Sequence, residues 1–221
     1  MRRFEEEFRG LNNALLDMGG MVAQSVHRSV LALVERNAEY AYEVRRDEVR
    51  IDECDIRIDA MASTLIALEQ PVASDMRLVI AAIKISTDLE RMGDLAVNIA
   101  TRALSLMDHP ELHPSIGLAE IAGLVESMVL RSLDAFVRRD AQVAQAVLTS
   151  DHGVDALRAG IQRDVVELMR RDPTAIERAL DHLIAARSLE RIGDHARNIA
   201  EGVIYLVQGV DVRHQPAGMM Q

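Results

Sequence analysis

Apolar residues recur in alternating steps of three and four along most of this 221-residue chain. One such series runs Leu78, Ala82, Ile85, Leu89, Met92, Ala96, Ile99, Ala103 and Leu106. This spacing keeps apolar side chains on one face of an α-helix, and near-heptad seams of this kind pack helices in antiparallel bundles. Only five prolines interrupt the chain, and no segment alternates apolar and polar residues as a strand would. The sequence therefore predicts an all-α protein.

The breaks between periodic segments predict where the helices begin and end. We expect six helices, at about residues 3–36, 38–70, 75–108, 115–138, 140–172 and 174–209. Asn37, Ser74 and Asp140 have the side chains preferred at helix N-caps. Pro71 and Pro173 fall in the expected hairpin turns between consecutive helices.

A helical phrase occurs twice, as DLERMGDLAVNIA at 88–100 and as SLERIGDHARNIA at 188–200, with nine of thirteen positions identical. A second echo relates RNAEYAYEV at 36–44 to RDAQVAQAV at 139–147. Duplication of a three-helix unit is the simplest account of both. We therefore expect two tandem antiparallel three-helix bundles, residues 1–108 and 115–209, followed by a C-terminal tail at 210–221.

Acidic residues spaced four apart occur on the second and third helix of each half. These pairs are Glu48 and Asp52, Glu90 and Asp94, Asp151 and Asp155, and Glu190 and Asp194. Residues at this spacing share a helix face, where like charges repel. In each half the midpoint between the two pair centres falls on the turn, at Pro71 or beside Pro173. Residues equidistant from a hairpin turn lie level, so each half is expected to gather four carboxylates.

The acids point away from the apolar seam, which predicts an outward-facing, oxygen-rich surface. Such a surface suits hard cations such as Mg, Ca, Mn or Fe, and holds Zn less selectively. Asn98 and Asn198 share the direction of the acids, and His152 and His195 adjoin them, so these four are candidate auxiliary ligands. An ordinary solvated acidic face is the alternative interpretation. Gly93 and Gly193, in mid-helix, are best explained by close helix packing.

Several functional classes lack support in the sequence. The net charge of −10 argues against nucleic-acid binding, and the single Cys54 excludes an internal disulfide. The apolar run LVIAAI is too short to span a bilayer, and acids occupy the N-terminal positions where a signal peptide is apolar, which predicts a cytoplasmic protein. No phosphate-binding glycine loop, nucleophile elbow or Glu-x-x-His pair occurs. We therefore expect no catalytic activity.

The phrases LERMGDLAVNIA and LERIGDHARNIA resemble the doubled E(D)xxxD signature of the PhoU family of phosphate-uptake regulators. The segments EQPVASDMRLV (69–79), MGGMV (18–22) and YLVQGVDVRH (205–214) are also similar to family segments, so the resemblance covers almost the whole chain. It implies two three-helix PhoU repeats, usually in a homodimer. It also implies metal ions (Fe, Zn, Mg or Mn) on surface acids, in some members as multinuclear iron or zinc clusters. Carried over residue by residue, the ligands are Glu48, Asp52, Glu90, Asp94, Asp151, Asp155, Glu190 and Asp194.

The resemblance further implies negative regulation of the phosphate regulon. Its members work at the cytoplasmic face of the Pst phosphate ABC transporter, where the transporter ATPase subunit and a PhoR-type sensor kinase are the partners. Contact with the membrane would then be made through these partners only. Two alternatives stay open from the residues alone: a metal-dependent phosphohydrolase built on the carboxylates, and a purely structural helical dimer.

Overall fold

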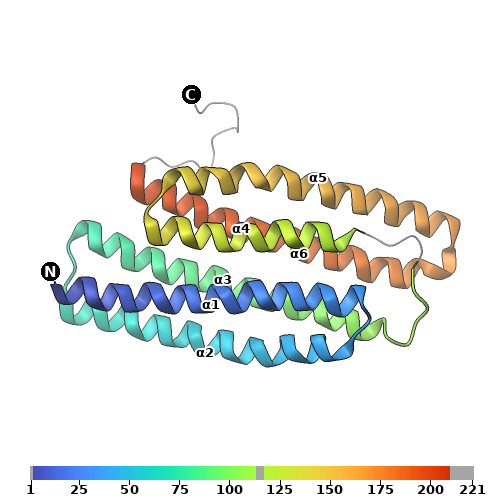
Figure 1. Cartoon of the computed structure of the whole chain (residues 1–221), viewed down its shortest axis with the longest axis horizontal. Helices are drawn as coiled ribbons and strands as arrows, with labels where there is room; N and C mark the ends of the chain where they lie inside the picture. Colours follow the sequence, from blue (N-terminus) through green and yellow to red (C-terminus); the bar gives the residue numbers. More distant parts are fainter. Residues whose placement is uncertain (1, 113–116, 210–221) are drawn as a thin grey trace.

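Six long helices make up the computed structural model, which describes residues 2–112 and 117–209 (Figure 1). They are α1 (Arg2–Val34), α2 (Ala38–Glu69), α3 (Ala73–Ser105), α4 (Leu118–Arg138), α5 (Ala141–Arg171) and α6 (Ile176–Gln208), with a 3-10 turn at Pro173–Ala175. No strand occurs in the described ranges, so the all-α fold with two three-helix repeats is confirmed. None of the described helices is long and apolar enough to cross a membrane. The predicted tail at 210–221 lies outside the described residues.

The helix ends follow local chemistry. The Asn37 side chain accepts a hydrogen bond from the Glu39 amide at 3.0 Å, and Asp140 caps α5 in the same way, so both predicted N-caps are confirmed. The prediction for Ser74 is wrong. Helix α3 already begins at Ala73, because the carbonyl of Val72 accepts the first amide bonds of the helix after Pro71 sets the turn.

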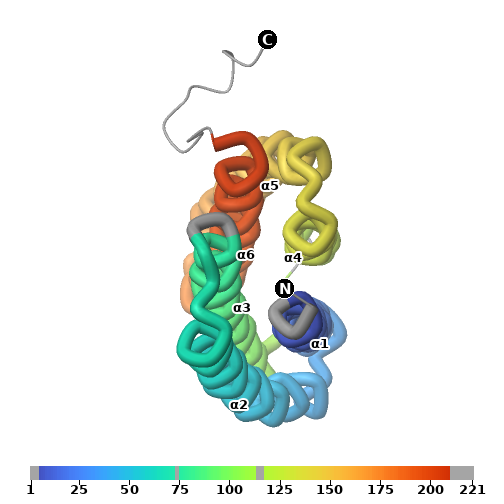
Figure 2. Tube along the Cα trace, turned by 90° about the vertical axis from the view of Figure 1, so that its left-hand side faces the viewer, coloured from blue at the N-terminus to red at the C-terminus, as the bar shows by residue number. Residues whose placement is uncertain are grey.

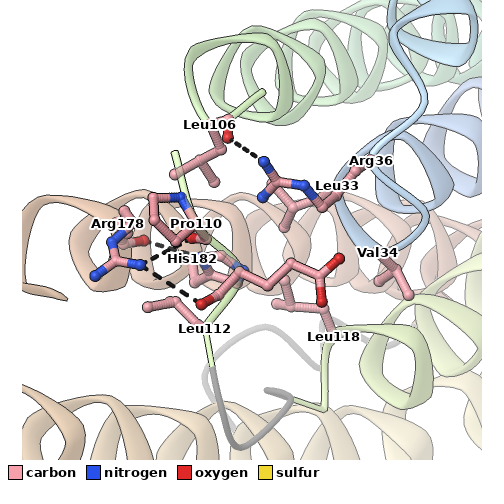
Figure 3. A pocket seen from close by; sticks show the side chains of 10 residues that line it. Leu33, Val34, Arg36, Leu106, Pro110, Leu112, Leu118, Arg178 and His182 are labelled. Carbon is pink, nitrogen blue, oxygen red and sulfur yellow. Dashed lines mark hydrogen bonds between the residues drawn. The ribbon is translucent and has the colours of Figure 1, made fainter. Parts of the chain in front are cut away.

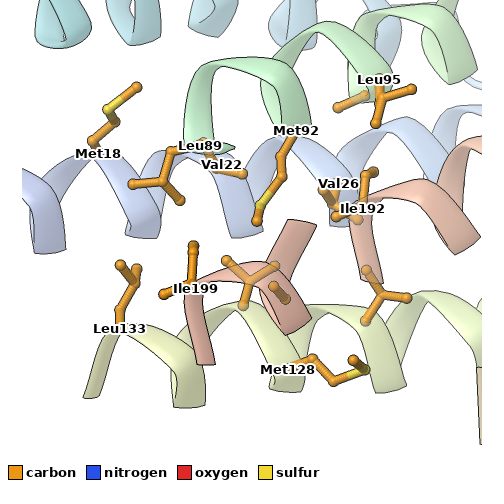
Figure 4. Close-up of a cluster of buried hydrophobic side chains, with 14 of the residues drawn as sticks. Met18, Val22, Val26, Leu89, Met92, Leu95, Met128, Leu133, Ile192 and Ile199 are labelled. Atoms are coloured by element: carbon orange, nitrogen blue, oxygen red, sulfur yellow. The ribbon is translucent and has the colours of Figure 1, made fainter. Parts of the chain in front are cut away.

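The two repeats are fused along their inner helices. Within each repeat every helix packs against the other two, but α3 also packs along α6 and α1 along α4 (Figure 2). Helices α2 and α5 flank this inner group, α2 against α1 and α3, and α5 against α4 and α6. The four inner helices contribute to one continuous apolar core that includes Met18, Leu89, Met92, Met128, Ile192 and Ile199 (Figure 4).

Polar contacts fix the register between the repeats. Asp88 on α3 accepts from His195 on α6 at 2.8 Å, and Asp181 accepts from Ser105 at 2.9 Å further along the same pair of helices. Ser105 is at the end of α3, whereas its partner Asp181 is near the start of α6. The two helices therefore run antiparallel. A similar cross-repeat pair joins α1 to α4. The repeats therefore share both an apolar core and a fixed register.

Two arginines hold the connection between the repeats (Figure 3). Arg36, just after α1, donates to the carbonyls of Leu106 and Met107 at 2.9 and 2.8 Å. Arg178 on α6 donates to the carbonyl of Pro110 at 2.8 Å. Charged donors of this kind make strong hydrogen bonds to the backbone carbonyls that follow the end of α3. Both repeats therefore fix the described part of the connecting segment.

Gly19 lies at a tight contact of α1 with α4, because a Cβ atom at this position would overlap the buried side chain of Leu133. The neighbouring Gly20 faces open space. We expect Gly19→Ala to have an unfolding free energy about 1–3 kcal/mol below that of Gly20→Ala, because it overpacks the junction between the repeats. Urea unfolding of the two variants measures this difference, and equal stabilities would show that α1 and α4 do not meet there.

Candidate functional site

Four acids of the first repeat gather on α2 and α3. We call Glu48, Asp52, Glu90 and Asp94 the first patch. Burial raises the pKa of Glu48, and the charges of Asp52 and Asp94 raise it further. Burial likewise raises the pKa of Asp94, and Asp52 adds to this effect. Because Asp52 and Asp94 lie on different helices, this repulsion shows that the structure brings the two pairs together, as the hairpin geometry predicts.

Close packing beneath the patch sets this arrangement. A Cβ atom on Gly93 would lie 3.3 Å from the Ile51 side chain, so α2 and α3 approach tightly at this level. Ile51 precedes Asp52 and Gly93 precedes Asp94 in the sequence. The acids of both helices therefore lie at the edge of this α2–α3 contact. The close-packing interpretation of Gly93 is confirmed. Asp52 and Asp94 are exposed and the two glutamates half-buried, which agrees with an outward-facing surface.

Sequence reasoning missed a fifth acid, Asp55. It follows Asp52 by three residues on the same face of α2. Burial is the largest cause of the raised pKa of Glu90, the charge of Asp94 is the second, and the charge of Asp55 is the third. The Ser86 hydroxyl donates to Asp55 at 2.5 Å and fixes the carboxylate beside α3. The spacing of 48, 52 and 55 on one helix face was the signal that could have identified it.

The equivalent acids of the second repeat, Asp151, Asp155, Glu190 and Asp194, form the second patch on α5 and α6. Burial raises the pKa of Asp194, and the charges of Asp151, Glu190 and Asp155 act in the same direction. The structure therefore brings these four together as well. Asp151 departs from the prediction of an outward-facing acid, because it is only 8% exposed.

Two arginines neutralise much of the second patch. Arg158 binds Glu190 with an N–O distance of 3.0 Å, and Arg197 binds Asp151 at 3.2 Å. Burial raises the pKa of Asp151, while the Arg197 guanidinium works against this rise. Alignment of the repeats places Asp55 at the position of Arg158 and Val97 at the position of Arg197.

The first patch thus has an additional acid where the second has a cation. None of its four acids forms an ion pair within residues 2–112 and 117–209, and nearby Arg45 and Arg91 only partly oppose the rise in the pKa values of Glu48 and Glu90. The two patches share a motif but differ in charge. The first is a group of carboxylates without ion pairs, and in the second two of the four acids are paired with arginines.

The four candidate auxiliary ligands do not all adjoin one patch. His152 is exposed, and its charge lowers the pKa of Asp151, so it adjoins the second patch. His195 instead binds Asp88 across the repeats. Asn198 lines a hollow between α3 and α6 together with Lys84. Asn98 is half-buried on α3.

The donor chemistry of both patches suits a hard cation, since carboxylate oxygens are the preferred ligands of such ions. Among the described side chains, no three of His, Cys, Asp or Glu already converge closely enough to hold a metal ion. A cation at the first patch would therefore have to draw its carboxylates together. The exposed Asp52 and Asp94 have the freedom to rotate, and a cation would relieve the repulsion that raises their neighbours' pKa values.

The charge difference between the patches has a direct consequence for stability. In chelator-treated protein at pH 7, we expect Glu90→Gln to raise the unfolding free energy by about 0.2–0.5 kcal/mol, because it removes like-charge repulsion. Glu190→Gln is expected to lower it by about 0.2–1 kcal/mol, because it breaks the pair with Arg158.

The pH dependence of Glu90→Gln follows from the raised pKa of Glu90. The folded state binds this proton more tightly than the unfolded state, so the destabilisation by ionised Glu90 disappears as pH falls through the raised pKa towards the ordinary value. The gain from Glu90→Gln should therefore vanish near pH 4, about the ordinary pKa of glutamate. Urea titrations at pH 4 and 7 measure both variants, and shifts of the same sign at pH 7 would refute the charge difference.

The fold and these patches define a class: an all-helical protein of two fused three-helix repeats, each carrying an acidic motif on its second and third helices. The model of the PhoU domain matches residues 15–103 and again 118–203, one match in each repeat. The chain belongs to the PhoU domain family, as the resemblance of its repeated phrases predicts.

Known proteins agree over almost the full length. The chain is 42% identical over 214 residues to the phosphate-specific transport system accessory protein PhoU homolog of Pseudomonas aeruginosa, covering 96% of this chain and 88% of that protein. A crystal structure of PhoU from Pseudomonas aeruginosa matches with a TM-score of 0.89 at 42% identity, over 94% of this chain and 100% of that one. The phosphate transport system regulatory protein PhoU from Streptococcus pneumoniae matches with a TM-score of 0.87 at 28% identity, over 95% and 99%.

Proposed function

We propose that this chain is a non-enzymatic accessory protein of phosphate uptake that acts in the cytoplasm as a negative regulator. The observation that carries the proposal is the similarity over 96% of the chain to a relative named as an accessory protein of phosphate-specific transport. Both repeats take part in this similarity, because the family model matches each of them. A regulatory role is supported by the name of the pneumococcal structure, a phosphate transport system regulatory protein.

In this role the acidic patches bind metal ions, with Fe, Zn, Mg and Mn as the candidate cofactors. The mutual repulsion of Glu48, Glu90 and Asp94 supports the first patch as the stronger site. A cation held there would cross-link α2 to α3 and neutralise their excess charge. At the second patch, Arg158 and Arg197 already occupy Glu190 and Asp151, so a cation would have to displace guanidinium groups.

The partners in this proposal are the ATPase subunit of the Pst transporter and a PhoR-type sensor kinase, which the chain links as a homodimer. When phosphate is plentiful, this assembly holds the kinase in its inactive mode. The chain reaches the membrane only through the transporter. The support is the family membership together with the transport-system names of the relatives.

Deletion of the gene in its native host tests this function. Expression of phosphate-starvation genes in phosphate-rich medium is expected to rise strongly, because the kinase would lose its restraint. Reintroduction of the intact chain should restore repression. Unchanged expression after deletion would refute the regulatory role. A broad panel of phosphoesters offered to metal-loaded protein tests the non-enzymatic part, and turnover that first-patch variants abolish would identify a metal-dependent phosphohydrolase instead.

A further inference from the structure

A groove runs between the repeats, along α3 and α6 and beside the end of α4. It consists of two adjoining hollows of about 510 and 270 Å³, which share Phe136, Val203 and Leu206 in their walls. We call this the inter-repeat groove. Its apolar lining comprises Leu78, Ile85, Phe136, Ile199, Val203 and Leu206. None of the eight acids of the two patches lines it, although Arg197 binds both Glu201 in its wall and Asp151 of the second patch.

The groove exists because small residues meet where the two inner helices cross. The register set by Asp88 and His195 brings Ala81 level with Gly202, and both line the groove. A Cβ atom added to Gly202 would meet no atom within 4 Å. Glycine within a helix costs about 1 kcal/mol relative to alanine, so this position carries a cost that packing does not explain.

The lining of the groove carries three cations against two acids, although the chain carries a net charge of −10. Arg77, Lys84 and Arg139 line it, and none of them has an ion pair among the described residues. The two acids in its walls already have partners: Asp88 forms a hydrogen bond with His195, and Glu201 pairs with Arg197, which also binds Asp151. Lys84 is the only lysine of the chain. A ligand in the groove therefore faces cations above an apolar floor.

The shape of the groove favours a helical occupant. From Arg77 to Asp88 it follows about three turns of α3, roughly 16 Å at 1.5 Å per residue. Its floor is lined at helical spacing by Leu78 and Ile85 on one side and by Ile199, Val203 and Leu206 on the other. Tyr205 and Val207 at its edge are 50% and 44% exposed, which leaves apolar surface for a partner to cover.

We propose that the inter-repeat groove binds an amphipathic helix of a partner protein, one whose apolar face is flanked by acidic residues. Its apolar side chains lie over Phe136 and Val203, and its carboxylates pair with Arg77, Lys84 and Arg139. Helix-in-groove recognition of this kind reads apolar anchors at successive turns, with charge setting orientation. Binding at this groove requires neither the acidic patches nor a role in phosphate uptake.

Fluorescence anisotropy with a designed peptide tests the proposal. The probe is an acidic helix with leucines at heptad positions and glutamates on the flanks, compared with a scrambled peptide and a lysine-substituted one. Full-length protein should bind the acidic helix most tightly. Gly202→Leu, which fills the groove at an open position, should weaken binding by at least about tenfold. Gly123→Leu, at an equally open position on α4, should leave it unchanged.

A charge variant separates binding from folding. Lys84→Glu leaves the groove open but reverses one of its charges. It should therefore weaken binding of the acidic peptide and strengthen binding of the lysine-substituted peptide. Equal binding of all three peptides to the unaltered chain, or full binding to Gly202→Leu, would overturn the proposal. Sedimentation gives a further test. If Gly202→Leu converted a dimer to a monomer, a second copy of the chain would be the occupant of the groove, and the proposal would be overturned. Loss of binding to phosphatidylglycerol vesicles on Lys84→Glu, without an effect on the peptide, would assign the groove to lipid and overturn it too.

Discussion

Leu89→Ala is expected to lower the free energy of unfolding by about 2–5 kcal/mol, the usual range for a buried leucine truncated without collapse of the cavity. Leu89 has no exposed surface and belongs to the core that the four inner helices share (Figure 4). Because helices of both repeats line this core, the loss should fall on the whole molecule. The variant is therefore expected to unfold in one cooperative transition.

Urea unfolding followed by circular dichroism gives the free energy, and hydrogen exchange reports α2 and α5 separately. Both outer helices should lose protection together in Leu89→Ala. Leu180→Ala provides the matched control, since Leu180 is 43% exposed on α6 and its truncation should change stability little. If α5 kept its protection from hydrogen exchange while α2 lost it, the two repeats would unfold independently. The shared core would then not couple their unfolding.

Metal binding at the first patch is expected to give the second large effect. A ligand that binds only the folded state stabilises it by about 2.7 kcal/mol when its concentration is a hundred times the dissociation constant. Mn²⁺ should therefore raise the unfolding free energy of chelator-treated protein. The variant with Glu48→Gln, Asp52→Asn, Glu90→Gln and Asp94→Asn should lose most of this gain. Amides keep the size of the carboxylates, so the helix packing at Gly93 is preserved.

The second patch supplies the matched comparison for this prediction. Asp155→Asn with Asp194→Asn removes two of its acids and leaves both arginine pairs in place. This variant should retain most of the Mn²⁺ effect, because the stronger site is elsewhere. Sodium chloride at equal ionic strength controls for screening of exposed charges. Equal Mn²⁺ stabilisation of the unaltered chain and both variants would show that neither patch is a specific site.

The sequence was sufficient to predict the helices and the gathering of the acids. Helices rise by the same amount per residue, so positions equidistant from Pro71 must lie level once α2 and α3 form a hairpin. The periodicity did not reveal that α3 packs along α6, because an apolar seam shows that a helix face is buried but not which helix covers it. Ser74 was misplaced because a good capping side chain lay just after the real start.

The partners of the neutralising arginines could not have been predicted from the repeated phrase, although Arg197 belongs to it. Arg158 lies a turn beyond Asp155, and Arg197 lies outside the acid spacing itself. Arginine side chains are long enough to reach a neighbouring helix, so their partners depend on the packed geometry rather than on sequence spacing. The burial of Asp151 likewise depends on how α5 packs, which its spacing from Asp155 does not reveal. The residue differences between the repeats are visible in the sequence, but which acids the arginines bind is a property of the tertiary structure.

Elemental analysis of protein purified from its host without chelator tests the central claim most directly, namely that the first patch binds metal. The unaltered chain should retain Fe, Zn, Mg or Mn through purification. The variant in which all four first-patch acids become amides should lose most of this metal, and Asp155→Asn with Asp194→Asn should keep it. Equal metal content in all three proteins would contradict the account and return the first patch to an ordinary solvated acidic surface.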